Sequence, residues 1–184
     1  MHWIDPDHLP EWRGTVSRFL LNLHGELDGL ILGTRRGRQV HFPPHLSRQV
    51  ARHIAIGDKI RVRGVKPRGA DMIVAVALST RGGSTIRDEG PGGRRDTHPR
   101  MHAKHQKMEA SGKVVLRLFG AKGELRGALL ADGTSLRMPP DTAAYLATYL
   151  TPGMHVQAWG HGIRNRYGCT MEVEAIAELI DVPG

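Results

Sequence analysis

The sequence predicts an all-β chain with short helices, in which one structural unit occurs twice. Two observations lead to this fold class. A pattern of glycines, prolines and apolar runs recurs at an offset of 96 to 98 residues. Each copy also consists mainly of short runs of Val, Leu and Ile bounded by turn residues, which is typical of strands. The length of 184 residues suffices for two small domains.

The repeat is clearest in two pairs of peptides. Residues 25–29 (GELDG) match residues 123–127 (GELRG) at an offset of 98. The Pro-Pro pair that begins at Pro43 matches the pair that begins at Pro139 at an offset of 96. The offset changes because the first copy carries two extra residues in the arginine-containing turn 34–37. We therefore interpret the chain as an internal duplication.

The first copy predicts three strands, a helix and two further strands. Its predicted strands are 14–23, 26–33, 38–42, 59–63 and 72–78. The third strand ends at Pro43, because proline cannot donate to a strand ladder. Leu46, Val50 and Ile54 then recur every four residues, as on one face of a short helix over 45–54.

The second copy predicts the same order of elements. Asp141 lies near the start of a helix over 141–150, and Ala143, Leu146 and Leu150 fall on one side of it. The counterparts of the last two strands of the first copy are 154–160 and 169–179.

This order of elements within the 66 residues of 14–79 resembles the OB-fold, a five-stranded barrel with a helix between strands three and four. The resemblance also covers 112–179 and extends to tandem OB-fold proteins of bacteria. It implies two tandem five-stranded barrels, and OB-folds commonly bind single-stranded nucleic acid over strands two and three. A barrel of this size is marginal alone, so we expect the two barrels to pack together or to dimerise.

The remaining segments are expected to lie outside the two barrels. Residues 1–13 are expected to form an arm and residues 180–184 a tail. Residues 80–111 are rich in Gly, Pro and charge and predict a flexible, basic, His-containing linker, in which 98–108 could form a helical turn or two.

The net charge of +8 is unevenly distributed. The first copy has eleven basic and four acidic residues, the linker seven and four, and the second copy seven and six. The basicity therefore belongs to the first copy and the linker, which favours a polyanionic partner.

Composition and motifs exclude several classes of protein. No apolar run is long enough to span a bilayer, and no secretory signal precedes the first copy, so we expect a cytoplasmic protein without a membrane role. Cys169 is the single cysteine, which excludes an internal disulfide. The chain contains no phosphate-binding loop, nucleophile elbow or zinc-peptidase motif. We therefore expect a non-catalytic protein with no cofactor.

The leading hypothesis is binding of single-stranded DNA or RNA through the first copy and the linker. The candidate phosphate contacts are Arg35, Arg36, Arg38, Lys59, Arg61, Arg63, Lys66 and Arg68. The candidate base contacts are Phe19 and His41 in the first copy and Trp159 and Tyr167 in the second.

Two alternatives stay open. One is a protein-interaction or assembly module, in which barrel edges and the helix face bind a protein partner or a second copy of the chain. The other is a sensor of a metal or small molecule. His98, His102 and His105 lie at spacings of four and three, which would place them on one side of a helix as a metal site requires.

Overall fold

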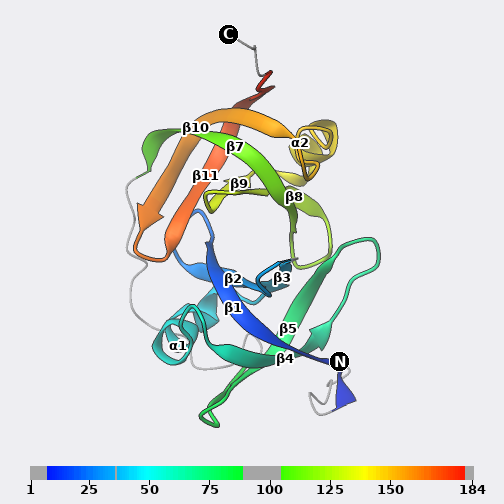
Figure 1. Ribbon diagram of the computed structural model, residues 1–184, viewed down its shortest axis with the longest axis vertical. Coiled ribbons are helices and arrows are strands. Elements are labelled where there is room, and N and C mark those ends of the chain that lie inside the picture. The colour runs from blue at the N-terminus through cyan, green and yellow to red at the C-terminus, as the bar shows by residue number, and fades with distance from the viewer. Residues whose placement is uncertain (1–7, 36, 89–104, 181–184) are drawn as a thin grey trace.

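The computed structural model describes residues 8–35, 37–88 and 105–180, which form two closed barrels stacked along the long axis of the molecule (Figure 1). Within these residues no helix combines the length and the apolar character that crossing a membrane requires.

The first barrel is a ring of five strands. They are β1 (Glu11–Leu21), β2 (Leu27–Leu32), β3 (Arg38–His41), β4 (Lys59–Val65) and β5 (Met72–Thr80). Strand β1 is antiparallel to both β2 and β4, and the parallel pairing of β3 with β5 closes the ring. A 3₁₀ turn η2 (Pro44–Leu46) and helix α1 (Ser47–His53) lie between β3 and β4. Strand β6 (Thr85–Arg87) pairs with β5 and extends the sheet beyond the barrel.

The second barrel repeats this ring. Its strands are β7 (Gln106–Phe119), β8 (Leu125–Leu130), β9 (Thr134–Arg137), β10 (His155–Asn165) and β11 (Gly168–Glu178), with helix α2 (Pro140–Tyr145) between β9 and β10. The order around the barrel is β10-β11-β9-β8-β7. The predicted fold class is therefore confirmed: two five-stranded barrels, each with a helix between its third and fourth strands.

The structure differs from the prediction mainly at the ends of elements. Strand β7 begins at Gln106, inside the segment assigned to the linker, because its first residues pair with β10. The helical turn predicted over 98–108 is therefore wrong for its last residues, and 98–104 lie outside the described residues. Helix α2 ends at Tyr145, and hydrogen-bonded turns replace the rest of the predicted helix.

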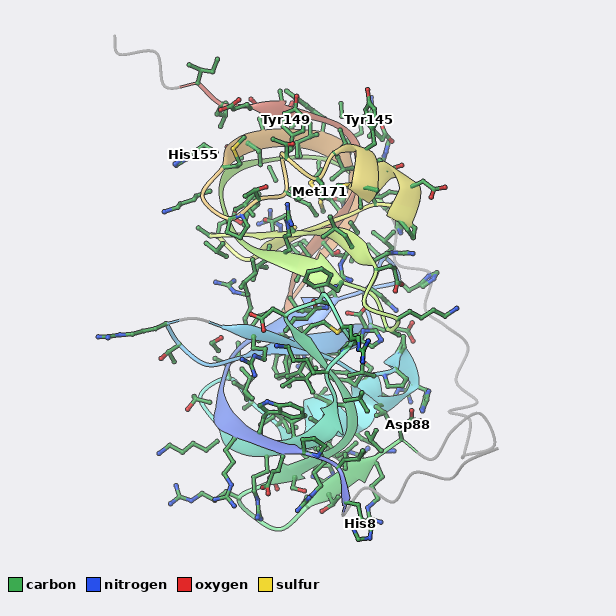
Figure 2. The ribbon with its side chains drawn as sticks, turned by 90° about the vertical axis from the view of Figure 1, so that its right-hand side faces the viewer. His8, Asp88, Tyr145, Tyr149, His155 and Met171 are labelled. Atoms are coloured by element: carbon green, nitrogen blue, oxygen red, sulfur yellow. The ribbon has the colours of Figure 1, made fainter. Side chains whose placement is uncertain are left out.

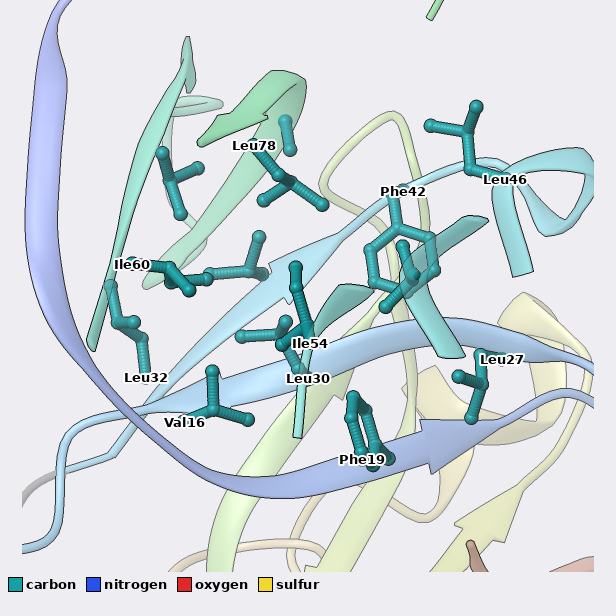
Figure 3. Packing of buried hydrophobic residues seen from close by; sticks show 14 of the residues in the cluster. Val16, Phe19, Leu27, Leu30, Leu32, Phe42, Leu46, Ile54, Ile60 and Leu78 are labelled. Atoms are coloured by element: carbon teal, nitrogen blue, oxygen red, sulfur yellow. The ribbon is translucent and has the colours of Figure 1, made fainter. Parts of the chain in front are cut away.

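Each barrel encloses its own apolar core. In the first barrel Phe42 and Leu30 are fully buried, and Leu46 and Val50 bring the η2–α1 segment against them (Figure 3). The helix thus packs against the strands of the barrel because its apolar positions recur on one side. The second core is built in the same way, with Ala143 of α2 among its buried residues.

A third apolar cluster joins the two barrels. Leu20 and Ile31 of the first barrel pack against Leu118 and Leu129 of the second. The offset of 98 makes Leu118 and Leu129 the repeat equivalents of Leu20 and Ile31. The barrels therefore contact each other through the same face, which confirms the expectation that they pack together.

Polar contacts surround this cluster. The Gln39 side chain donates to the Phe119 carbonyl at 2.9 Å and accepts from the Phe119 N–H at 2.8 Å. Arg137 donates to the Leu21 carbonyl at 3.0 Å and to Asp28 at 3.2 Å. Because Gln39 and Asp28 are buried, these bonds satisfy groups that would otherwise lose their water contacts unpaired.

Candidate nucleic-acid interface

The face that OB-folds commonly use for ligands is covered in the first barrel. Every residue of β2 is buried, since Leu30 points into the barrel core and Ile31 into the cluster between the barrels. Gln39 of β3 is bonded to the second barrel. A long ligand must therefore contact the protein on another face.

The outward side chains of β1, β4, β5 and β6 form a continuous basic surface on the first barrel. Cross-strand register places Arg61 opposite Arg13, and Arg63 opposite Glu11. On the other side of β4, Arg63 faces Ala77, which in turn faces Arg87 of β6. We refer to this surface as the basic sheet face; its charged residues are Glu11, Arg13, Lys59, Arg61, Arg63, Arg81 and Arg87.

Its one carboxylate, Glu11, lies among three arginines. A Glu11 oxygen is 3.3 Å from Arg13 Nε and 3.8 Å from Arg61 Nε, and the other oxygen is 3.5 Å from Arg63. Lys59, Arg81 and Arg87 have no carboxylate partner among the described residues. The face therefore keeps a large positive excess after its internal ion pairs are counted.

One end of the basic sheet face is hollowed. The depression has a volume of about 480 Å³. Its lining residues are Arg13, Gly14, Thr15, Lys59, Ile60, Arg61, Ser79 and Arg81.

The equivalent face of the second barrel has a different charge. Strand β10 carries His155, Gln157 and Trp159 where β4 carries Lys59, Arg61 and Arg63. Glu109 is the repeat equivalent of Glu11, but across the strands it faces Trp159 and not an arginine. The positive surface is therefore a property of the first barrel and not of the repeated unit.

The structure separates the predicted phosphate contacts into two groups. Lys59, Arg61 and Arg63 lie on the basic sheet face, near the end of β5. Arg38 and Lys66 lie near the start of β5. There Arg38 Nε is 3.4 Å from Asp71 and Lys66 Nζ is 3.9 Å from the same carboxylate. Arg35 and Arg68 are exposed in loops, and Arg36 lies outside the described residues.

The predicted base contacts are not gathered around the basic surface. Phe19 is only 5% exposed and belongs to the core, so its ring is not available to a base. Tyr167 meets Phe19 edge to face at 5.9 Å and packs against the first barrel. Trp159 is half-buried on β10 of the second barrel. Tyr145, exposed on α2, lies at the end of the second barrel away from the first (Figure 2).

His41 lies between the barrels. Burial lowers the pKa of His41 from its ordinary value of 6.5. The carboxylates of Asp28 and Glu124 oppose this effect, and Arg137 adds to it. His41 is thus a partly buried residue whose lowered pKa favours the neutral imidazole.

The histidines considered as metal ligands do not form a site in the described part of the chain. His105 Nε2 is 2.7 Å from the Leu23 carbonyl, while His98 and His102 lie outside the described residues. No three His, Cys, Asp or Glu side chains that the structure describes are grouped as a metal site requires.

Arg13, Arg81 and Arg87 were not among the predicted contacts. Residues 11–15 alternate between polar and other side chains, which signals that β1 starts before Gly14. For Arg81 and Arg87 the local sequence offers no comparable signal, because β6 is only three residues long.

Fold and surface together define a tandem-barrel protein with a positive sheet face on one barrel. No family model and no curated protein matches the sequence. Among solved structures, the chain is similar to the wild-type single-stranded DNA binding protein from Thermus aquaticus. The identity is 13%, 95% of this chain and 93% of that chain are covered, and the TM-score is 0.31. For a deletion mutant of that protein the identity is 13%, the coverage is 94% of this chain and 95% of that chain, and the TM-score is 0.30. Likeness of this degree carries no argument about function.

Proposed function

We propose that the protein binds nucleic acid, as single-stranded DNA or RNA, along the basic sheet face. The observation that carries the proposal is the alignment of six cations against one carboxylate over four neighbouring strands. The second barrel has the same fold without this charge, so general solubility does not explain it.

The geometry of a sheet suits a chain of phosphates. Alternate residues on β4 are about 7 Å apart, so Lys59, Arg61 and Arg63 form a row, and Arg13 lies one strand away, at about 4.8 Å. Arginine can donate two parallel hydrogen bonds to one phosphate, and each phosphate contact releases counterions into solution. The surface therefore supports binding that weakens as salt concentration rises.

The kind of contact follows from what the face contains. The outward residues of the described strands, from Glu11 to Thr15 and on β4 to β6, include no aromatic ring. Contacts to the backbone hold a strand without reading its sequence. A single strand is flexible enough to follow a twisted sheet, whereas duplex DNA is stiff over about 150 base pairs. We therefore expect little sequence preference and a preference for single strands.

Fluorescence anisotropy with labelled single-stranded DNA, single-stranded RNA and duplex DNA, at several salt concentrations, tests the proposal. The test variant is Arg61→Gln with Arg87→Gln. The control is Lys107→Gln with Lys113→Gln, which removes two exposed cations from β7 of the second barrel.

Loss of two phosphate contacts should flatten the slope of log K against log salt by about 1.4 and weaken binding about 15-fold near 0.15 M salt. The control should bind as the wild type does. Equal losses in both variants, or no binding of any nucleic acid near 0.15 M salt, would contradict the proposal; in the latter case a protein partner becomes the better explanation.

The cations near the start of β5 form a secondary prediction. Arg38 is the first residue of β3 and shares Asp71 with Lys66, which follows β4; Arg35 and Arg68 lie in the adjoining loops. We propose that they extend the path of a longer strand. Substituting Arg35 and Arg38 by Ala should then weaken binding of long oligonucleotides more than binding of short ones.

A further inference from the structure

The depression at one end of the basic sheet face has the composition of an anion site. Four cations line it, from β1, β4 and the turn after β5, and two hydroxyl groups join them. The cations are Arg13, Lys59, Arg61 and Arg81, and the hydroxyls belong to Thr15 and Ser79. Its lining residues include no carboxylate.

Two acidic residues lie close to the depression in the chain or across the sheet, and neither pairs with Lys59 or Arg81. The Asp58 carboxylate, next to Lys59 in the chain, accepts a hydrogen bond from the Ala55 N–H at 2.8 Å. Glu11 contacts Arg13 and Arg61 from the neighbouring row of the sheet. Lys59 and Arg81 are therefore the cations of the depression that no carboxylate of the described chain neutralises.

A phosphomonoester fits this set of groups better than a phosphodiester does. A monoester carries a charge of about −1.5 to −2 at pH 7 and three strong acceptor oxygens. A diester inside a strand carries one charge and exposes only two unesterified oxygens. The depression offers two unpaired cations, two arginines shared with Glu11 and two hydroxyls. These are more hydrogen-bond donors and more positive charge than the two free oxygens of one diester can use.

The depression also lies where the sheet ends. Strand β4 begins at Lys59 and β5 ends at Thr80, so these two strands add no outward side chains beyond the depression. A nucleic-acid strand that follows β4 therefore reaches the end of the basic sheet face here.

We infer that the depression binds the terminal phosphate of a nucleic-acid strand, so that the protein prefers phosphorylated ends. This inference rests on the proposed function, because the rest of the strand is held by the basic sheet face. The phosphate makes no covalent bond in this interaction; it is held by charge and hydrogen bonds alone.

The experiment compares one oligonucleotide with 5′-phosphate, 3′-phosphate or hydroxyl ends on both sides, by competition in fluorescence anisotropy near 0.15 M salt. The variants are Lys59→Gln with Arg81→Gln, which changes the depression, and Arg87→Gln, which changes the same face outside it. A nucleoside monophosphate, as an unlabelled competitor, distinguishes a strand end from a free small molecule.

We expect the oligonucleotide with one of the two phosphorylated ends to bind at least about 4-fold more tightly than the oligonucleotide with hydroxyl ends. This factor corresponds to one additional phosphate contact. Lys59→Gln with Arg81→Gln should abolish this ratio, whereas Arg87→Gln should weaken all oligonucleotides and keep the ratio. Equal binding of all ends overturns this inference and leaves the proposed function intact. A nucleoside monophosphate that competes as well as the oligonucleotide also overturns it. Failure of every oligonucleotide to bind overturns the proposed function itself.

Discussion

Replacing Glu11 by Gln should make the protein bind nucleic acid more tightly. Glu11 is the one carboxylate of the basic sheet face, and its oxygens lie within 4 Å of Arg13, Arg61 and Arg63. A bound phosphate must compete with this carboxylate for the same guanidinium groups. Gln keeps the size of the side chain and removes the charge, so the guanidinium groups of Arg13 and Arg61 lose their carboxylate partner and can pair with a phosphate.

The expected gain is that of about one additional phosphate contact. For a single strand, one contact steepens the slope of log K against log salt by about 0.7, which corresponds to about 4-fold tighter binding at 0.15 M salt relative to 1 M. The ion pairs cost little to lose, because partly exposed pairs contribute about 0–1 kcal/mol each to stability. We therefore expect an unchanged free energy of unfolding within about 1 kcal/mol.

The assay is anisotropy over a series of salt concentrations, with Glu109→Gln as the matched control. Glu109 is the repeat equivalent of Glu11 and faces Trp159 in the second barrel. Both variants raise the net charge by one, so a general charge effect would shift them equally. Weaker or unchanged binding by Glu11→Gln, or equal gains in the two variants, would refute the reasoning.

Three further predictions concern the contact between the barrels. Gln39→Leu leaves the N–H and the carbonyl of Phe119 without their side-chain partner. The free energy of unfolding, measured by urea denaturation, should fall by about 2–4 kcal/mol, and a change below about 0.5 kcal/mol would contradict this. Arg137→Met should cost about 3–5 kcal/mol because Asp28 is left buried without its cation, and combining it with Asp28→Leu should recover part of the loss. Burial lowers the pKa of His41 in the folded state, so the unfolded chain binds more protons as pH falls below 6.5. The free energy of unfolding should therefore fall as pH drops through that value. His41→Gln should reduce this pH dependence, and an identical pH profile for the variant would contradict the prediction.

The barrels themselves could be predicted from local patterns. Gly25 and Gly123 adopt φ of 81° and 80°, which is why the two hairpin turns carry glycine at equivalent positions. The alternation of Lys59, Ile60 and Arg61 predicts a strand with a basic outward row, and in β4 Ile60 is buried while Lys59 and Arg61 are exposed.

The sequence also contains a signal that the outward face of the second strand is buried. Leu30, Ile31 and Leu32 follow one another in β2, and a strand that is apolar on both faces is buried on both. The run predicts a strand over 26–33, but it does not by itself say what covers the outward face. The second apolar face contacts the other barrel, which removes strands two and three from contact with a ligand.

The basic sheet face could not be assembled from local patterns alone. Arg13 and Arg61 are 48 residues apart, and they become neighbours only through the register of β1 with β4. Arg87 joins them through β6, which is too short to leave a periodic signal. A one-residue shift in either pairing would have sent these side chains to the opposite face.

The symmetry of the contact between the barrels bears on how such a chain could arise. Leu20 with Ile31, and Leu118 with Leu129, are the same patch used twice, as in the isologous interface of a homodimer. Fusion of two such subunits into one polypeptide gives the partners an effective concentration in the millimolar range, independent of expression level. Once assembly is guaranteed in this way, the two halves can diverge in role. One half can keep Arg61 while the other carries Gln157, and the pair still assembles.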